Sequence, residues 1–220
     1  MTRLVKAVVK GFKGLGRGVS INFSGNTVVV GGSGSGKTSL MEALALLMQS
    51  RGEEWLVLEG NFLIIHEPED LVYGLNPDET VTVGVYYEVD NDGEELSHSI
   101  GLELKRGSVI GYHYNFRLRD YWVRQEVYLD NEPVAIVEKV GNDGVMRHPV
   151  NSKLCIAPTH VMHEDAFMAC DGDQSRKANA LVFVLRNMLK NKFYYLGEGR
   201  VCWWKRDYET TVDLPSNSVG

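Results

Sequence analysis

Residues 27–49 read TVVVGGSGSGKTSLMEALALLMQ, and this stretch decides the fold. It begins with a β-branched run, Thr27 to Val30, and passes through a loop rich in glycine. It then becomes a run of strong helix formers, Thr38 to Gln49. The pattern GxxxxGK[ST] is matched in full from Gly31 to Thr38, and this motif requires a strand before it and a helix after it. The sequence therefore predicts a strand, a glycine-rich loop and a largely buried helix in succession.

The residue types of this loop indicate phosphate binding. Glycines allow backbone angles that point consecutive N–H groups inward, and these donors bind phosphates together with the positive end of the following helix. Lys37 is predicted to reach the β- and γ-phosphates, and the Thr38 hydroxyl is predicted to bind Mg²⁺. We therefore expect ATP and Mg²⁺ as cofactors. The expected nucleotide-binding residues of the loop and helix are Gly31, Gly32, Ser33, Gly34, Ser35, Gly36, Lys37, Thr38 and Ser39.

Composition describes an ordinary globular chain. It has 220 residues and a net charge of -6, which excludes a uniformly basic nucleic-acid coat but not a local basic patch. Three widely spaced cysteines predict neither a disulfide framework nor a cysteine zinc site. The N-terminus lacks a signal-peptide pattern, and no apolar run approaches the ~20 residues of a membrane span. We therefore expect a cytoplasmic protein without a membrane partner.

The rest of the chain predicts an α/β fold. From Glu79 to Met146, alternating apolar and polar residues with regular turn signals predict an antiparallel meander of about five strands. We expect a P-loop NTPase lobe (residues 1–78 and 151–220) with a mixed sheet around the loop helix, and an antiparallel β-meander subdomain (residues 79–150). Strands expected within the meander include Leu96–Leu104, Gly111–Arg119, Trp122–Leu129 and Val134–Val140. Outside it, the expected strands are Leu4–Val9, Val19–Phe23, Trp55–Leu58, Phe62–Ile65, Lys153–Ala157 and Phe193–Leu196. A further helix is expected over Ser175–Leu189.

The acidic part of an ATPase is hard to find in this sequence. A complete P-loop ATPase needs a hydrophobic strand that ends in an acidic residue near the metal. Trp55–Glu59 has the profile but ends in Glu, Val127–Asp130 reads as a hairpin turn, and Asp213 follows a single apolar residue. A guanine-reading motif is also lacking, because Asn191–Tyr194 has no Asp. ATP binding without a complete catalytic half is the expectation.

The surroundings of the loop carry a family resemblance. A strand, the turn Gly-Phe-Lys-Gly-Leu at 11–15 and a second strand precede the loop, and Ser39–Leu44 fits the helix pattern S-L-x-E-A-L. An antiparallel lobe follows, and residues 192–200 are similar to a later YxxxxR segment. This arrangement resembles RecF-type and SMC-type ATPases, AAA-type ATP-binding proteins of the ABC branch that serve DNA repair and chromosome maintenance.

The resemblance implies one half of a composite ATP site. Heads of that family sandwich two ATP molecules between protomers, and the signature loop of one protomer completes the site of the other. The chain would be the N-terminal half of such a head. ATP hydrolysis is then expected only with the missing half, either downstream or in a partner chain. A homodimer or a complementary ATPase half, and DNA, are the implied partners.

The resemblance also implies roles for individual residues. Lys13 falls where an Arg or Lys of the family approaches the nucleotide. The family's Gln-bearing metal loop has no counterpart after Lys153–Ala157, where His160 or His163 could substitute and Gln174 is a weaker candidate. Four potential metal ligands lie close together in the sequence: His160, His163, Glu164 and Asp165. A solvated loop is a better interpretation of this cluster than an intrinsic metal site, and His163 stays a candidate Mg²⁺ ligand.

Two features and two rival functions stay open. Residues 112–124 mix aromatics with arginines, which suits either nucleic-acid stacking or a strand with Arg–carboxylate pairs. Trp203 and Trp204 suggest an interface. The first rival function is a P-loop kinase of a small molecule or nucleotide, with Glu59 as metal or substrate partner and a parallel sheet. The second is a non-catalytic, ATP-gated regulatory module that partners an effector nuclease.

Overall fold

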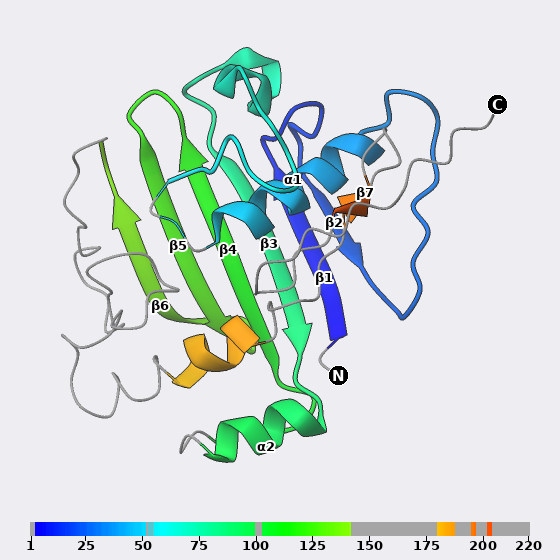
Figure 1. Cartoon of the computed structure of the whole chain (residues 1–220), viewed down its shortest axis with the longest axis vertical. Coiled ribbons are helices and arrows are strands. Elements are labelled where there is room, and N and C mark those ends of the chain that lie inside the picture. Colours follow the sequence, from blue (N-terminus) through cyan, green and yellow to red (C-terminus); the bar gives the residue numbers. More distant parts are fainter. Residues whose placement is uncertain are drawn as a thin grey trace.

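A computed structural model describes residues 3–51, 53, 55–99, 103–141, 180–187, 195–196 and 202–203. Its main element is an antiparallel sheet of six strands in the order β2-β1-β3-β4-β5-β6 (Figure 1). A pair of short strands forms a second, two-stranded sheet. The strands are β1 (Arg3–Lys10), β2 (Val19–Asn22), β3 (Val81–Glu88), β4 (Val109–Arg117), β5 (Trp122–Leu129), β6 (Glu132–Lys139), β7 (Tyr195–Leu196) and β8 (Cys202–Trp203).

One face of the large sheet is the core face. Because side chains alternate along a strand, residues that pair across neighbouring strands share a face. The row that runs through Ala7, Val85, Tyr112, Val127 and Ala135 is entirely buried. The next row has the same character and includes one polar side chain: its members are Val9, Val83, Tyr114, Gln125 and Val137.

Helix α1 (Lys37–Ser50) covers this face of the sheet (Figure 1). Most of its residues between Leu40 and Met48 are buried, as a helix that is apolar nearly all round requires. The helical residues 180–187 add Leu181, Val184 and Leu185 to the same core. The glycine-rich loop therefore lies at the N-terminus of a helix that is packed on the sheet.

Short connectors complete the end of the molecule near the β1–β2 turn. The 3-10 helices η1 (Pro68–Leu71) and η2 (Tyr73–Leu75) pack against that turn. The backbone N–H of Lys13 donates to the Leu71 carbonyl over 2.9 Å, and the N–H of Tyr73 donates to the Gly11 carbonyl over 2.8 Å. Two backbone hydrogen bonds thus join the turn to this segment.

The expectation of a strand over Leu96–Leu104 was wrong. Helix α2 (Asn91–Ser99) occupies the first part of that region. The Asp90 side chain accepts a hydrogen bond from the Gly93 N–H over 3.0 Å, and the Asp90 carbonyl accepts one from the Glu94 N–H over 2.9 Å. Asp90 therefore caps a helix where the sequence predicts a turn between two strands of the meander. Acidic residues in the first turn of the helix favour the same result.

The expected strand at Thr27–Val30 was also wrong, as were those at Trp55–Leu58 and Phe62–Ile65. Residues 27–30 lie in no strand, and the 55–65 region contains only an isolated bridge between Glu59 and Ile64. In the part of the chain that the structure describes, the sheet beneath α1 is antiparallel throughout and not mixed. Thr27–Val30 pairs with no described strand, although β2 and β6 are edge strands that have only one described neighbour each.

The other described elements follow the sequence closely. The strands at the N-terminus, the loop helix and the three strands β4, β5 and β6 lie within a few residues of their expected bounds. Residues 180–187 fall inside the expected helix Ser175–Leu189, and β7 falls inside Phe193–Leu196. The expected strand Lys153–Ala157 lies outside the described residues.

The large sheet runs across the expected boundary at residue 79. Strand β1 of the predicted lobe pairs with β3 of the predicted subdomain, for example Ala7 with Val85. The division into a lobe and a subdomain stays a prediction. Among the described residues, no helix has both the length and the apolar composition to cross a membrane.

Candidate phosphate-binding site

The loop before α1 needs glycine for two separate reasons. Gly34 and Gly36 have φ angles of 75° and 85°, in the left-handed region that favours glycine. A side chain at Gly31 would meet the Ser35 hydroxyl, since its β-carbon would lie 2.7 Å from Ser35 Oγ. A side chain at Gly36 would meet Leu15 in the same way. Conformation or lack of space therefore accounts for Gly31, Gly34 and Gly36.

The side chain of Lys37 folds back over this loop. Its ammonium donates hydrogen bonds to the carbonyls of Gly31 and Gly32 over 2.8 and 2.7 Å. A third, longer bond of 3.2 Å reaches Ser35 Oγ. The positive charge is thus held against the loop backbone and remains close to the solvent, where an incoming phosphate would meet it.

The N-terminus of α1 is left without a local cap. Gly36 is the N-cap residue, so no side chain caps the helix, and the first turn contains no acidic residue. The first N–H groups of a helix lack intrahelical partners, and the helix dipole is positive at this end. Thr38 is exposed in this first turn. These residues fit a magnesium-bound polyphosphate: uncapped donors and Lys37 for the phosphates, and the Thr38 hydroxyl for the metal.

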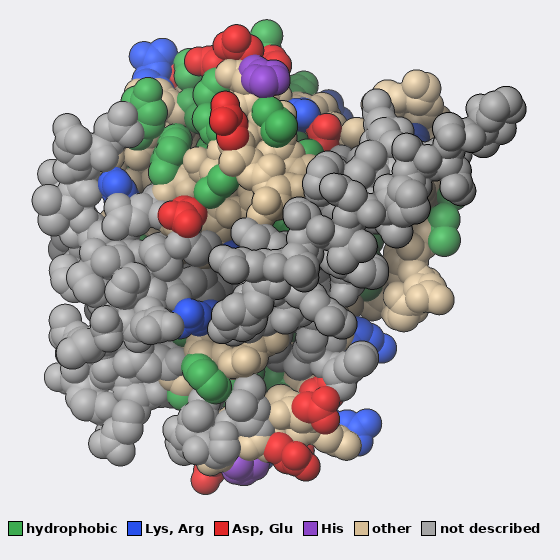
Figure 2. Space-filling view, in the orientation of Figure 1, with side chains coloured by type: hydrophobic (Ala, Val, Ile, Leu, Met, Phe, Trp, Pro, Cys, Tyr) green, Lys and Arg blue, Asp and Glu red, His purple; other side chains and the backbone are tan. Residues whose placement is uncertain are grey.

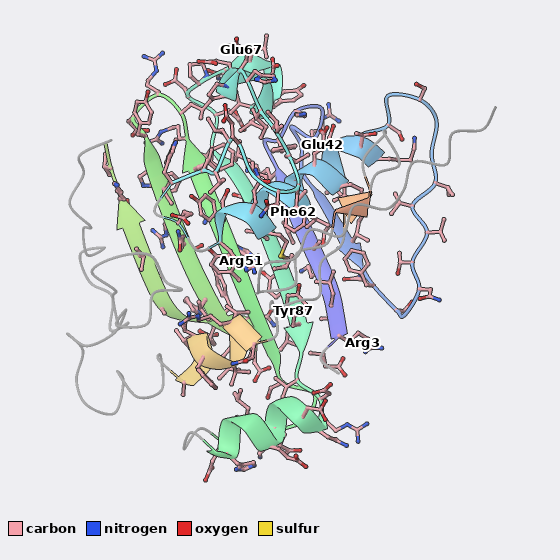
Figure 3. All side chains as sticks on the ribbon, in the orientation of Figure 1. Arg3, Glu42, Arg51, Phe62, Glu67 and Tyr87 are labelled. Carbon is pink, nitrogen blue, oxygen red and sulfur yellow. The ribbon has the colours of Figure 1, made fainter. Side chains whose placement is uncertain are left out.

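Lys13 lies beside the loop helix, in the turn between β1 and β2. Its ammonium forms an ion pair with Glu42 of α1, with 2.7 Å between Nζ and Oε2. Figure 3 shows Glu42 on the part of α1 that lies near this turn. Glu42 was not singled out from the sequence. The signal that could have identified Glu42 is its spacing, because a residue four positions after Thr38 lies on the same side of the helix as Thr38.

Of the remaining predicted metal and acidic residues, several lie outside the described part of the chain. His160, His163 and Gln174 lie outside the described residues. Within the described ranges no three His, Cys, Asp or Glu side chains gather as a metal site would require. Glu59 is exposed in its isolated bridge.

The segment Val127–Asp130 is confirmed as the approach to a hairpin turn. Asp130 and Asn131 have positive φ angles of 50° and 71°, as the turn between β5 and β6 requires. The Asp130 carboxylate accepts a hydrogen bond from the Val109 N–H over 2.7 Å. Its role in the described structure is to join this turn to the start of β4.

The aromatic and arginine residues at 112–124 form structural contacts. Tyr112, Tyr114 and Phe116 are buried on the core face of β4. The three arginines form ion pairs with carboxylates: Arg117 with Asp120, Arg119 with Asp78, and Arg124 with Glu126. These contacts favour the reading of a core strand with Arg–carboxylate pairs over a nucleic-acid surface.

The loop and helix define a P-loop nucleotide-binding unit. Residues 6–110, just under half of the chain, match a family model described as an AAA domain. The matched segment contains the loop, α1, the β1–β2 turn with Lys13, and the strands up to the start of β4. The match supports an AAA-type, ATP-binding P-loop ATPase. A comparison with curated proteins gave no match.

Proposed function

We propose that this chain is the ATP-binding lobe of a RecF/SMC-like ATPase. It would bind ATP with Mg²⁺ and couple ATP-dependent dimerisation to the handling of DNA or nucleoprotein. Its site is one half of a composite site, and a complementary ATPase half or a second copy completes it. Hydrolysis belongs to the completed site.

The observation that carries the proposal is the exposure of the segment leading into the loop. Val28 and Val30 are 82% and 83% exposed, and Val29 is 39% exposed. Figure 2 shows hydrophobic side chains on the projecting segment between β2 and α1. Three consecutive β-branched apolar residues favour a strand packed in a sheet. The phosphate-binding loop needs such a strand to hold it, so we propose that the complementary half supplies its neighbour.

The loop itself supports the nucleotide part of the proposal. Its uncapped helix start, its left-handed glycines and Lys37 are the groups that hold a polyphosphate in this class of site. Mg²⁺, when bound, would neutralise charge between the phosphates, and Thr38 is the residue that would ligate it. Lys13 is the further residue that we propose to approach the nucleotide.

The rival kinase function receives less support. It predicts a parallel sheet, whereas the described sheet is antiparallel in every pairing. Its proposed partner residue, Glu59, is exposed in a short bridge with Ile64. The non-catalytic regulatory module has the same structural support as the ATPase half, and turnover is what separates these two.

The first experiment measures binding of a fluorescent ATP analogue to the isolated chain with Mg²⁺. Wild type should bind, and Lys37→Met should lose most of that affinity. Lys105→Met is the matched control. Lys105 is an exposed lysine in the connection between α2 and β4, so its replacement should not change the affinity for ATP. Equal binding by the wild type and Lys37→Met would exclude the loop as the nucleotide site.

The second experiment measures phosphate release by the chain alone and with a candidate complementary half. The proposal expects little release alone and a clear increase with the added half, together with nucleotide-dependent association in sedimentation. Robust turnover by the isolated chain would contradict the half-site. Binding without turnover in the completed assembly would instead favour the regulatory module.

A further inference from the structure

The ion pair between Lys13 and Glu42 joins the β1–β2 turn to the loop helix. The two charged atoms are 2.7 Å apart, and the side chains are 31% and 21% exposed. Salt screens a partly buried ion pair less than it screens a fully exposed one. The Lys13 ammonium also lies 5.8 Å from the centre of the Phe12 ring. Lys13 is therefore held in a defined place although its side chain is long and flexible.

The backbone of Lys13 is fixed in an unusual conformation. Its φ angle is 45°, in the left-handed region that few non-glycine residues adopt. The N–H of Lys13 donates to Leu71, and the N–H of Leu15 donates to the Phe12 carbonyl over 2.8 Å. Residues held in such conformations persist only where the surroundings determine them, and they are frequent at functional sites.

Glu42 places Lys13 on the side of α1 that carries Thr38. Residues four apart on a helix have β-carbons about 5–6 Å apart on the same side. Lys37 is already bonded to the loop carbonyls. Lys13 is therefore a second ammonium near the start of α1, and its partner is a carboxylate one turn beyond the predicted metal-binding hydroxyl.

We infer that the Lys13–Glu42 pair is a latch that nucleotide opens. The inference rests on the proposed function, and specifies how its site responds to a ligand. Without nucleotide, Glu42 holds Lys13. The polyphosphate carries more negative charge than one carboxylate, so it attracts the Lys13 ammonium more strongly and draws it from Glu42. Because Lys13 lies in the turn between β1 and β2, this exchange of partners makes the contacts of that turn depend on whether nucleotide is bound.

The latch makes Glu42 a competitor of the nucleotide for Lys13. Removing the carboxylate should therefore tighten ATP binding, and only while Lys13 is present. A residue that merely supported the helix would not show this dependence on Lys13. A residue that positioned Lys13 for the phosphates would show the opposite sign, since its removal would weaken binding.

The test is a double-mutant cycle on ATP affinity. The proteins are the wild type, Lys13→Gln, Glu42→Gln and the double variant, titrated with a fluorescent ATP analogue and Mg²⁺. Glu42→Gln should bind about threefold more tightly than wild type, which corresponds to the loss of one ordinary ion pair. Lys13→Gln should bind more weakly, and adding Glu42→Gln to it should change little. Lys13→Arg keeps the charge and should keep the coupling to Glu42.

The outcomes distinguish the latch from the proposed function. An equal gain from Glu42→Gln in both backgrounds would mean general electrostatics and would overturn the latch alone. Weaker binding by Glu42→Gln would also overturn it. Absence of ATP binding by the wild type would overturn the proposed function as well. Thermal midpoints of all variants are measured, and Lys13→Met, which also removes the charge, replaces Lys13→Gln in the cycle if the latter does not fold.

Discussion

Leu15 occupies the space beside Gly36 so fully that a β-carbon added to Gly36 would lie 2.5 Å from Leu15 Cδ2. Leu15 comes from the β1–β2 turn and is 8% exposed, and Gly36 is the N-cap of α1. The contact therefore joins the sheet directly to the last residue of the phosphate-binding loop before its helix. It makes the geometry of the loop depend on a side chain that carries no chemistry of its own.

We predict that Gly36→Ala damages the loop more than Gly34→Ala does. Both glycines have left-handed φ angles, which cost an alanine about 1–2 kcal/mol. Only Gly36 also meets a neighbour, and forced packing adds about 1–3 kcal/mol. Urea unfolding and ATP-analogue titration of the two variants measure the difference.

The matched control is Gly34→Ala, because no atom lies near a β-carbon at Gly34. Leu15→Ala removes the contact but not the backbone strain, so it should cost less stability in the Gly36→Ala background than in the wild type. If the two glycine variants were equally affected, the Leu15 contact would have no energetic role.

Gln49 carries the second prediction, because its side-chain amide holds the loop after α1. Its Oε1 accepts from the N–H of Leu63 over 3.0 Å, and its Nε2 donates to the Val57 carbonyl over 2.5 Å. Gln49→Leu should lower the free energy of unfolding by about 1–3 kcal/mol, because it leaves these partly buried backbone groups without partners. Met41→Leu, on the exposed side of the same helix, should change it by less than about 0.5 kcal/mol. Equal denaturation midpoints for the two variants would contradict this role.

Much of the framework could be predicted because it depends on local patterns. The helix formers after Gly36 and the alternation in β5 determine those elements without reference to the rest of the fold. Asp130 and Asn131 between β5 and β6 are residues that tolerate positive φ, so the hairpin could be recognised as well.

What could not be predicted depends on contacts between distant segments. Thr27–Val30 has strand-forming residues, but it pairs with no described strand, and such pairing depends on tertiary context that the local pattern does not contain. Glu42 became a candidate only when the turn carrying Lys13 was placed against α1. A further signal was missed: Tyr112, Tyr114 and Phe116 are two apart, which marks one face of a strand and hence the core face.

The third prediction concerns acid stability and His113. His113 lies on β4 between Gly84 and Glu126 of the neighbouring strands, and its Nε2 is 2.8 Å from the Tyr86 hydroxyl. Burial lowers the pKa of His113 below its ordinary value, while the Glu126 carboxylate opposes the shift and Lys6 adds to it. The unfolded chain therefore binds a proton at a higher pH than the native chain does. The contribution of neutral His113 to the free energy of unfolding is therefore fully present above the ordinary histidine pKa. It is lost as the pH falls from that pKa toward the lowered pKa of the native state.

His113→Gln should remove this part of the pH dependence. Thermal midpoints are compared at about pH 7.5 and about pH 5.5, which bracket the ordinary histidine pKa. The drop between the two conditions should be smaller in His113→Gln than in wild type. His66→Gln, at an exposed histidine, should keep the wild-type drop. An unchanged drop in His113→Gln would show that other groups cause the acid sensitivity.

The fourth prediction separates folding from assembly at the exposed segment before the loop. Val28→Asp combined with Val30→Asp should leave the isolated chain folded, with a stability change within about 0.5 kcal/mol, because both side chains are more than four-fifths exposed. The same variant should lose nucleotide-dependent association with the complementary half, since buried carboxylates without partners oppose sheet formation. Ile64→Asp is the control, because Ile64 is 66% exposed and lies beyond α1 in the chain. Sedimentation of each variant with and without ATP measures association. Normal association of the valine variant would mean that this segment stays exposed to solvent in the assembly, and the composite site would then have to be completed through another surface.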